Sequence, residues 1–267
     1  MAIKNKVKLF VNRVRHLYNI YHTKNIVKQL KDILKLHKDR MPVIVVSYNN
    51  GVYVKNMVNQ LKKYDIKPII IDNNSTDEET RSILKELERD AYVIYSHKNF
   101  GHLVGVLTPV QDVLPKYFAY TDPDLELNKN LPKNFLDVLK ELTDKYEVYK
   151  AGFALELLDE PIVDAFMDDK FTGIPQMQIK KVKLINWVKR HWRFKLEHPS
   201  LEIYRAPVDT TFAVYNKDNF LDDFYDGIRV SGDFGAVHLP WYPHRELMSK
   251  KQREIYLQNN NSSTLRI

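Results

Sequence analysis

Short apolar runs rich in β-branched residues recur along the first part of the chain and alternate with stretches of helical spacing. The runs that predict strands lie at 42–49, 67–77, 91–97 and 117–127. Continuous apolar strands of this kind are buried on both faces, as in a parallel sheet that helices cover on both sides. The alternation of strands and helices therefore predicts an α/β fold with a mostly parallel sheet.

Each of these predicted strands ends in side chains that can form hydrogen bonds. In an open parallel sheet the carboxyl ends of the strands lie at one edge, and ligands bind there. The polar residues expected at this edge are Ser47, Tyr48, Asn49, Asp72, Asn73, Asn74, Ser75, His97, Asn99, Asp122 and Asp124. Four strands that deliver polar groups to one edge predict a crevice suited to a nucleotide.

Asp122 and Asp124 stand one residue apart at the end of the fourth run, in AYTDPDLELN. A surface turn is one explanation of the pair. The chain contains neither of the glycine-rich phosphate loops G-x-G-x-x-G and G-x-x-x-x-G-K-[ST]. A divalent cation held by carboxylates neutralises a diphosphate instead, while it keeps some of its water. The pair therefore predicts a site for Mn²⁺ or Mg²⁺.

In this part of the chain, the stretches VVSYNN, IIIDNNSTD, HKNFGH and TDPD together resemble nucleotide-sugar glycosyltransferases with the GT-A fold. The resemblance is to family 2 in particular, including its bacterial surface-glycan members, and it covers about residues 42–157. It implies a Rossmann-like domain and a glycosyltransferase (EC 2.4) that uses a nucleotide-sugar donor, expected to be a UDP-sugar. It also implies a saccharide or lipid-linked glycan as acceptor, and it favours transfer with inversion.

The resemblance assigns roles to the residues that match the motifs of the family. It implies that Asp72 contacts the nucleobase, and that Asn99 and Gly101 lie near the diphosphate. It further implies that Asp124 binds the metal directly, while Asp122 faces the ribose or the metal. The other residues expected to line the nucleotide site are Ser47, Tyr48, Asn49 and Asn74.

The C-terminal half departs from the family pattern, because no Glu-Asp pair stands where inverting enzymes usually place the catalytic base. Inversion needs a carboxylate that takes the proton of the attacking acceptor hydroxyl. Asp209, which lies 85 residues after Asp124, is the preferred candidate, as a base or an acceptor ligand; Glu156 in GFALEL is the second. A capping or turn role after Pro207 is the alternative for Asp209.

The stretch GAVHLPWY at 235–242 holds three further candidates. His238 is similar to a C-terminal histidine that some GT-A enzymes use as a third metal ligand, and imidazole suits Mn²⁺ beside oxygen ligands. A buried histidine bonded to the backbone is the alternative. Trp241 and Tyr242 are weaker candidates for stacking on an acceptor sugar ring, since large aromatic side chains more often pack in the core.

The positive charge of the chain is concentrated at its N-terminus. Residues 1–40 hold eleven Lys or Arg against two Asp, so this segment carries +9 and the remaining 227 residues carry −2 of the total of +7. Apolar spacing of three and four at 7–21 and 26–34 predicts amphipathic helices. Such a segment binds an anionic membrane surface, or packs on its own domain with a solvated basic face. The expected units are a basic amphipathic helical segment (1–40) and a catalytic domain (41–267) with a nucleotide-binding half (41–130) and an acceptor-binding half (131–267).

Composition excludes some classes of protein and leaves two alternatives to the glycosyltransferase. Without cysteine there are no disulfides or thiolate metal sites. No apolar run approaches about 18 residues, so we expect a cytoplasmic protein, at most peripheral on the inner face of the membrane. The acidic body argues against a nucleic acid as partner. The alternatives are a sugar nucleotidyltransferase, which would normally show a glycine-rich loop after its first strand, and a catalytically inactive binding protein.

Overall fold

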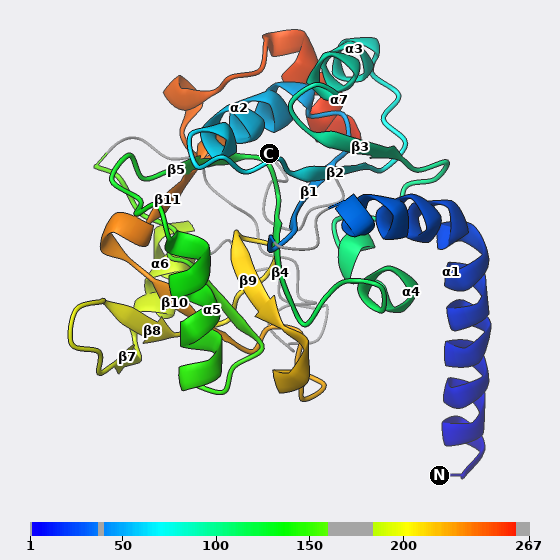
Figure 1. Ribbon diagram of the computed structural model, residues 1–267, viewed down its shortest axis with the longest axis horizontal. Helices are drawn as coiled ribbons and strands as arrows, with labels where there is room; N and C mark the ends of the chain where they lie inside the picture. The colour runs from blue at the N-terminus through cyan, green and yellow to red at the C-terminus, as the bar shows by residue number, and fades with distance from the viewer. Residues whose placement is uncertain (1, 37–39, 160–183, 260–267) are drawn as a thin grey trace.

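The computed structural model describes residues 2–36, 40–159 and 184–259. A mixed sheet of nine strands forms the centre of this described part, in the order β3-β2-β1-β4-β9-β6-β10-β8-β7. Its strands are β1 (Val43–Ser47), β2 (Ile69–Asp72), β3 (Tyr92–Tyr95), β4 (Tyr117–Thr121), β6 (Lys150–Phe153), β7 (Lys195–Leu196), β8 (Ile203–Arg205), β9 (Ala213–Asn216) and β10 (Gly227–Val230). The α-helices are α1 (Ala2–Leu36), α2 (Gly51–Lys62), α3 (Glu78–Leu87), α4 (Thr108–Gln111), α5 (Phe135–Lys145), α6 (Leu184–Val188) and α7 (Lys250–Asn259) (Figure 1).

The first four strands of this sheet are parallel. β1 pairs with both β2 and β4, and β2 pairs with β3, with Ser47 opposite Asp72 in the register. Every residue of β1 is buried, because helices cover both faces of the sheet. The structure therefore confirms the prediction of an α/β fold built on a mostly parallel set of strands.

One antiparallel strand joins the two halves of the sheet. β9 lies between β4 and β6 and runs antiparallel to both of them, with Ala213 opposite Tyr120. Because neighbouring antiparallel strands begin where their partners end, the residues just before β9 lie beside the carboxyl end of β4. This topology brings residues 207–212 to the edge of the sheet where Asp122 emerges.

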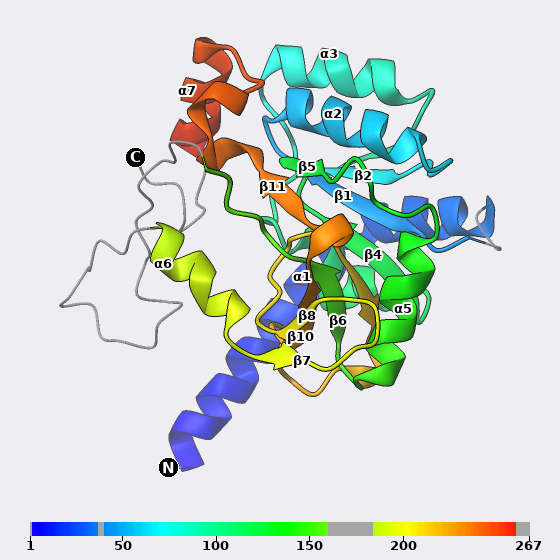
Figure 2. The same cartoon turned by 90° about the vertical axis from the view of Figure 1, so that its left-hand side faces the viewer.

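A second, two-stranded sheet lies above this edge. β5 (Leu125–Leu127) and β11 (Ala236–His238) pair in antiparallel fashion, and β5 packs against α2 (Figure 2). The register places His238 opposite Leu125. The pairing thus joins the segment after β4 to the C-terminal part of the chain.

The two faces of the main sheet have separate apolar cores. One core holds Met57 of α2 and Leu139 of α5, and the other holds Ile26 and Leu30 of α1 with Val110 of α4. Each of these five side chains is buried to 99% or more. Burial of this extent on both faces fixes the strand ends, and with them the side chains that follow.

The basic N-terminal segment is one continuous helix, α1, and not two successive helices. Its second half belongs to the domain, since Ile26 and Leu30 are buried in the core beside α4 and β3. Its first half leads away from the sheet (Figure 1). The second half of α1 therefore has the second expected arrangement, packing on its own domain, and binding of the helix to a membrane surface stays a prediction. Among the described residues, no helix has the length and apolarity needed to span a membrane.

Candidate nucleotide and metal site

The turn after β1 is fixed by Asn50. Its Oδ1 accepts hydrogen bonds from the backbone nitrogen of Tyr48, at 3.0 Å, and from the Ser47 hydroxyl, at 3.2 Å. Ser47 is fully buried, while Tyr48 is half-buried. Of these two residues, only Tyr48 offers side-chain surface at this edge of the sheet.

Asn49 joins the turns that follow β1 and β2. The Oδ1 of Asn49 accepts from the backbone nitrogens of Thr76 (2.8 Å) and Asp77 (3.0 Å). The backbone nitrogen of Asn49 donates to Ser75 Oγ (2.9 Å). Asn49 has a φ of 51°, in the left-handed region that asparagine tolerates better than most residues. The side chain predicted to line the nucleotide site is therefore engaged in holding the two turns together.

Asp72, at the end of β2, is 3% exposed. Its carboxylate accepts from the hydroxyl (2.5 Å) and the backbone nitrogen (3.0 Å) of Ser75. Burial raises the pKa of Asp72, although the hydrogen bonds from Ser75 and Ser47 oppose that rise. The residue expected to contact a nucleobase lies at the predicted edge with both oxygens bonded to its own turn.

The turn after β3 is tied to the turn after β2 through Asn73. Its Nδ2 donates to the carbonyl of Gly101, at 2.9 Å, and its Oδ1 accepts from the backbone nitrogen of Phe100, at 3.2 Å. Asn99 Oδ1 accepts from the nitrogen of Gly101, whose φ of 81° favours glycine. Asn74, with a φ of 62°, has an exposed side chain. The structure thus brings Asn74, Asn99 and Gly101 to one edge, as expected.

Asp124 and His238 meet at the centre of this edge. Asp124 Oδ2 lies 3.3 Å from His238 Nε2, and Asp124 is 5% exposed. The pairing of β5 with β11 brings them together, and Leu239 donates its backbone nitrogen to the Asp124 carbonyl at 3.0 Å. Among the described residues, Asp124 Oδ1 and His238 Nδ1 are buried without a hydrogen-bond partner. Buried polar atoms without a partner are rare and point to an absent ligand, ion or water.

Asp122 has a different environment. Thr210 donates its hydroxyl to Asp122 Oδ2, and Asp122 donates its backbone nitrogen to the Thr210 carbonyl at 3.0 Å. Burial and the negative charge of Asp124 raise the pKa of Asp122 well above its usual range. The carboxylate of Asp122 is therefore anchored to the residues that precede β9.

The predicted set of metal ligands is only partly assembled. Across residues 2–36, 40–159 and 184–259, no group of three or more His, Cys, Asp or Glu side chains is arranged to hold a metal ion. A cation that stays partly hydrated needs only one or two carboxylates when the substrate phosphates supply further ligands. Asp124 and His238 fit such a cation, because an unpartnered buried carboxylate oxygen stands next to an imidazole.

The two candidate bases have opposite electrostatic environments. Burial would raise the pKa of Asp209, but Arg229 and the hydrogen bonds from Thr211 outweigh it and hold that pKa below its usual range. Its Oδ1 accepts from Thr211 and lies 3.6 Å from Arg229 Nη2. Burial raises the pKa of Glu156, which lines a cavity of about 380 Å³ with Leu157, Lys189 and Trp192. These contacts favour Glu156 over Asp209 as a proton acceptor.

The two aromatic candidates for stacking on an acceptor are buried. Trp241 is 2% exposed, with its ring 4.7 Å from that of His238, and Tyr242 is fully buried with its hydroxyl accepting from Leu158 at 2.9 Å. Core packing, the alternative, accounts for both side chains. The structure does not support the prediction that either one stacks on an acceptor.

Sequence reasoning missed the residues that surround this site from distant parts of the chain. Tyr256 of α7 has a raised pKa because it is buried near the negative charges of Asp124, Asp122 and Glu246 and shares a side-chain hydrogen bond with Asp124. Thr210 holds Asp122, and the fully buried Lys150 and Arg229 lie beneath the segment that carries Thr210. No local signal identifies them, since a hydroxyl, a lysine and an arginine are ordinary surface residues until a fold buries them.

The fold and the site define a class of protein: an α/β domain with carboxylates that follow the carboxyl ends of its parallel strands. The family model described as "Glycosyl transferase family 2" matches residues 43–152. This part of the chain thus matches the family 2 glycosyltransferases, a class of enzymes that take a sugar from a nucleotide-sugar donor (EC 2.4). The resemblance seen in the sequence is confirmed.

Among solved structures, one similar protein is the mannosyltransferase PcManGT from Pyrobaculum calidifontis, in complex with GDP-Man and Mn²⁺. The two chains share 14% identity with a TM-score of 0.45, and the match covers 75% of this chain and 57% of that one. The chain thus spans little more than half the length of that enzyme, and so low a similarity does not transfer its donor or its metal. A search of curated proteins found no match.

Proposed function

We propose that this protein is a metal-dependent glycosyltransferase that moves a sugar from a nucleoside diphosphate donor, in the first instance a UDP-sugar, to a saccharide or lipid-linked glycan. The observation that carries the proposal is the pair Asp124–His238. A buried carboxylate with one unpartnered oxygen, next to a histidine, stands at the strand ends where ligands of α/β sheets bind. A partly hydrated Mn²⁺ or Mg²⁺ would satisfy that oxygen.

The residues around the crevice have separate roles in this proposal. Asp124 and His238 hold the cation, which supplies charge neutralisation for the departing diphosphate. Asp122 keeps its carboxylate at the ribose and metal side of the crevice. The turns that carry Asp72, Asn74 and Asn99 form the wall for the nucleotide.

Glu156 is the proposed base for inverting transfer. Its carboxylate is half-buried, its pKa is raised by burial, and it faces a cavity that contains an exposed lysine and a tryptophan ring. A raised pKa makes a carboxylate a better acceptor for the proton of the attacking hydroxyl. Asp209 is left as a structural ion-pair partner of Arg229.

A membrane-bound position of the enzyme on the cytoplasmic face is the second part of the proposal. Two apolar side chains on α1 are exposed, Leu17 (58% exposed) and Tyr21 (77% exposed). The exposed Lys24 and Lys28 follow them, so the four residues are spaced by three or four positions along the helix. These four residues therefore share one face of the helix. Apolar and basic groups on one face suit the interface of an anionic bilayer, which would bring the enzyme near a lipid-linked acceptor.

The direct test of the proposed function is to measure thermal unfolding of the protein with each of a UDP-, a GDP- and a dTDP-sugar. Each donor is tested both with and without Mn²⁺. A ligand at about one hundred times its dissociation constant stabilises the fold by about 2.7 kcal/mol, and we expect one of these donors to do so only when Mn²⁺ is present. If no donor changes the melting temperature with or without the metal, the proposal is wrong.

A further inference from the structure

Two fully buried cations lie beneath one short segment, Pro207–Thr211, which we call the 207–211 loop. Lys150 on β6 is 0% exposed and Arg229 on β10 is 1% exposed, although both side chains are long and charged. Buried charges are costly unless hydrogen bonds and opposite charges compensate them. The contacts of these two cations therefore show what the fold requires of them.

Lys150 fastens the middle of the loop. Its Nζ donates to the carbonyls of Val208, at 2.6 Å, and Asp209, at 3.1 Å, and lies 3.5 Å from the centroid of the Phe224 ring. The Tyr215 hydroxyl donates to the same Asp209 carbonyl, at 3.3 Å. The ammonium is thus held between loop carbonyls and an aromatic face, and these contacts offset part of the cost of burying its charge.

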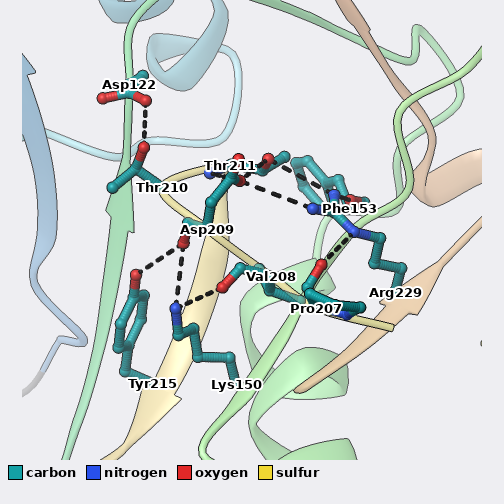
Figure 3. A network of polar contacts seen from close by, with 10 residues as sticks. All are labelled: Asp122, Lys150, Phe153, Pro207, Val208, Asp209, Thr210, Thr211, Tyr215 and Arg229. Atoms are coloured by element: carbon teal, nitrogen blue, oxygen red, sulfur yellow. Dashed lines mark hydrogen bonds and ion pairs between the residues drawn. The ribbon is translucent and has the colours of Figure 1, made fainter. Parts of the chain in front are cut away.

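Arg229 fastens the start of the loop. Its Nε donates to the Pro207 carbonyl at 2.9 Å, its Nη1 donates to the Phe153 carbonyl at 3.0 Å, and its Nη2 lies 3.6 Å from Asp209 Oδ1. The carbonyls of Pro207, Val208 and Asp209 are consecutive along the chain, and each accepts from one cation: the first from Arg229 and the other two from Lys150 (Figure 3). The backbone of the loop is therefore fixed residue by residue.

The next residue of the loop is Thr210, which is 4% exposed and holds Asp122 by two hydrogen bonds. Its hydroxyl donates to Asp122 Oδ2, and its carbonyl accepts from the Asp122 nitrogen at 3.0 Å. Figure 3 shows the second oxygen of Asp122 directed away from Thr210. One carboxylate oxygen of Asp122 accepts a hydrogen bond from the loop. Because the carboxylate is planar and rigid, this bond also fixes the direction of the second oxygen.

We propose that Thr210 is a positioning residue that sets the orientation of the Asp122 carboxylate, and that Lys150 and Arg229 act through the 207–211 loop to hold Thr210 in place. The part of this inference that concerns ligand binding rests on the proposed function, in which Asp122 faces the nucleotide and the metal. The physical reason is that an aspartate with one bonded oxygen keeps one side-chain conformation and is already oriented for its ligand.

The test compares three substitutions in the full chain. Thr210→Val removes the hydroxyl at nearly constant shape, and Thr210→Ser restores it. Thr211→Val is the matched control, because it removes a neighbouring buried hydroxyl that contacts Asp209 and, at 3.5 Å, Arg229, but not Asp122. Arg229 keeps its hydrogen bonds to the Pro207 and Phe153 carbonyls in this variant. In crystal structures we expect the Asp122 carboxylate to turn or lose its single orientation in Thr210→Val only. The proposal is overturned if the Asp122 carboxylate keeps its orientation in Thr210→Val, or if it turns as much in Thr211→Val.

Binding of Mn²⁺ with UDP, measured by calorimetry, gives a second readout. Losing one hydrogen bond to a charged group corresponds to about a ten-fold weaker binding in Thr210→Val, while Thr210→Ser and Thr211→Val should stay within about three-fold of wild type. If Thr210→Val binds UDP with Mn²⁺ as tightly as the wild-type protein does, the role of Thr210 is contradicted. If the wild-type protein itself binds no nucleoside diphosphate with Mn²⁺, the proposed function fails, whereas the crystal structures still decide the positioning role.

A double-mutant cycle tests whether Lys150 acts through Thr210. Lys150→Met should weaken Mn²⁺–UDP binding in the same direction as Thr210→Val, and the double variant should bind within about three-fold of Thr210→Val alone, since both changes break one chain of contacts. If the two losses multiply, Lys150 acts elsewhere and this part of the inference is wrong. Should Lys150→Met not fold, Phe224→Leu takes its place, because it removes only the ring against the ammonium.

Discussion

Asp124 Oδ2 and His238 Nε2 lie 3.3 Å apart although 114 positions separate the two residues in the sequence. The antiparallel pairing of β5 with β11 creates this contact, because it places His238 opposite the residue that follows Asp124. The consequence is a carboxylate–imidazole pair at the carboxyl ends of the parallel strands. Each of the two side chains there retains one buried atom without a partner in the described part of the chain.

Asp124→Asn should abolish the stabilisation that Mn²⁺ gives together with a donor nucleotide. The amide presents one weaker oxygen ligand to a hard cation, so metal binding falls while the shape of the site is kept. Without ligand, the variant should be at least as stable as wild type, since it removes a buried charge that His238 compensates only in part. Melting temperatures with Mn²⁺ and nucleotide, and then with a chelator, measure both effects.

The control for this change is Glu126→Gln, which alters an exposed carboxylate two residues further on that pairs with Arg245 at the surface. It should keep the full metal-dependent shift. A shift that survives in Asp124→Asn would show that the cation binds elsewhere.

Glu156→Gln and Asp209→Asn should separate a catalytic base from a structural carboxylate. Loss of a general base lowers kcat by about 10²- to 10⁴-fold, and we expect this for Glu156→Gln with little change in stability. Asp209→Asn leaves the buried Arg229 without its carboxylate and should lower the free energy of unfolding, by less than the about 3 kcal/mol of a fully buried pair because the Asp209 side chain is 41% exposed. Steady-state kinetics and urea unfolding of both variants measure the two effects, and the reverse pattern would return Asp209 to the role of base.

The pH dependence of kcat follows from the raised pKa of Glu156. A base works in its deprotonated form, so kcat should fall as the pH drops through a pKa that lies above the usual value of about 4.3 for glutamate. This fall of kcat at low pH, the acidic limb of the pH profile, should disappear in Glu156→Gln and remain in Asp209→Asn. An acidic limb that stays at the usual glutamate pKa in wild type would contradict the buried environment.

Gly235→Ala should displace the side chain of Glu156 while residue 156 itself stays a glutamate. A Cβ at position 235 would lie 1.8 Å from Glu156 Oε1 and 2.8 Å from its Cγ, so the glutamate side chain has to rotate away. Because this neighbour is a flexible side chain, the loss of stability should stay near 1 kcal/mol while kcat falls by at least about ten-fold. Gly232→Ala is the contrasting variant: nothing lies within 4 Å of its Cβ, but its φ of 66° makes the change costly to stability. Unchanged kcat in Gly235→Ala would exclude Glu156 as the base.

Much of the parallel half of the sheet could be predicted, because β1, β2 and β4 are buried on both faces and read as continuous apolar runs. The antiparallel insertion of β9 could not, since a four-residue strand carries no signal of its neighbours. β10 and β11 follow each other closely in the chain but belong to different sheets, because Gly232, with a positive φ, turns the chain between them.

The candidate site shows the same division between local and distant information. Asp122 and Asp124 stand out in the sequence because two carboxylates follow an apolar strand. Thr210, Lys150 and Arg229 do not, since their importance depends on burial and on contacts with distant segments. Nor could the sequence show that Arg229 would lower the pKa of Asp209 and weaken it as a base.

Reversing two charges on α1 should release the protein from anionic vesicles if that helix binds them. Each basic residue near the surface contributes about 1 kcal/mol, so Lys24→Glu with Lys28→Glu should weaken binding to phosphatidylserine vesicles by at least about thirty-fold. The matched control, Lys129→Glu with Lys251→Glu, makes the same change in net charge on exposed residues elsewhere. Equal losses in both pairs, measured by vesicle co-sedimentation, would mean that net charge and not α1 governs the binding.

Lys150 predicts a stability that depends on pH. Burial lowers the pKa of Lys150 to about 7 from its ordinary value of 10.5. Between these two values the unfolded chain binds more protons than the folded one, so the free energy of unfolding should rise with pH by up to about 1.4 kcal/mol per unit. The gain should be absent below pH 7, where both states carry the proton. Urea unfolding of wild type and Lys150→Met between pH 6 and 9 measures this difference, and subtracting the variant removes the contribution of other groups. If the free energies of unfolding of wild type and Lys150→Met change with pH in parallel, the loop carbonyls and the Phe224 ring keep Lys150 charged throughout this range.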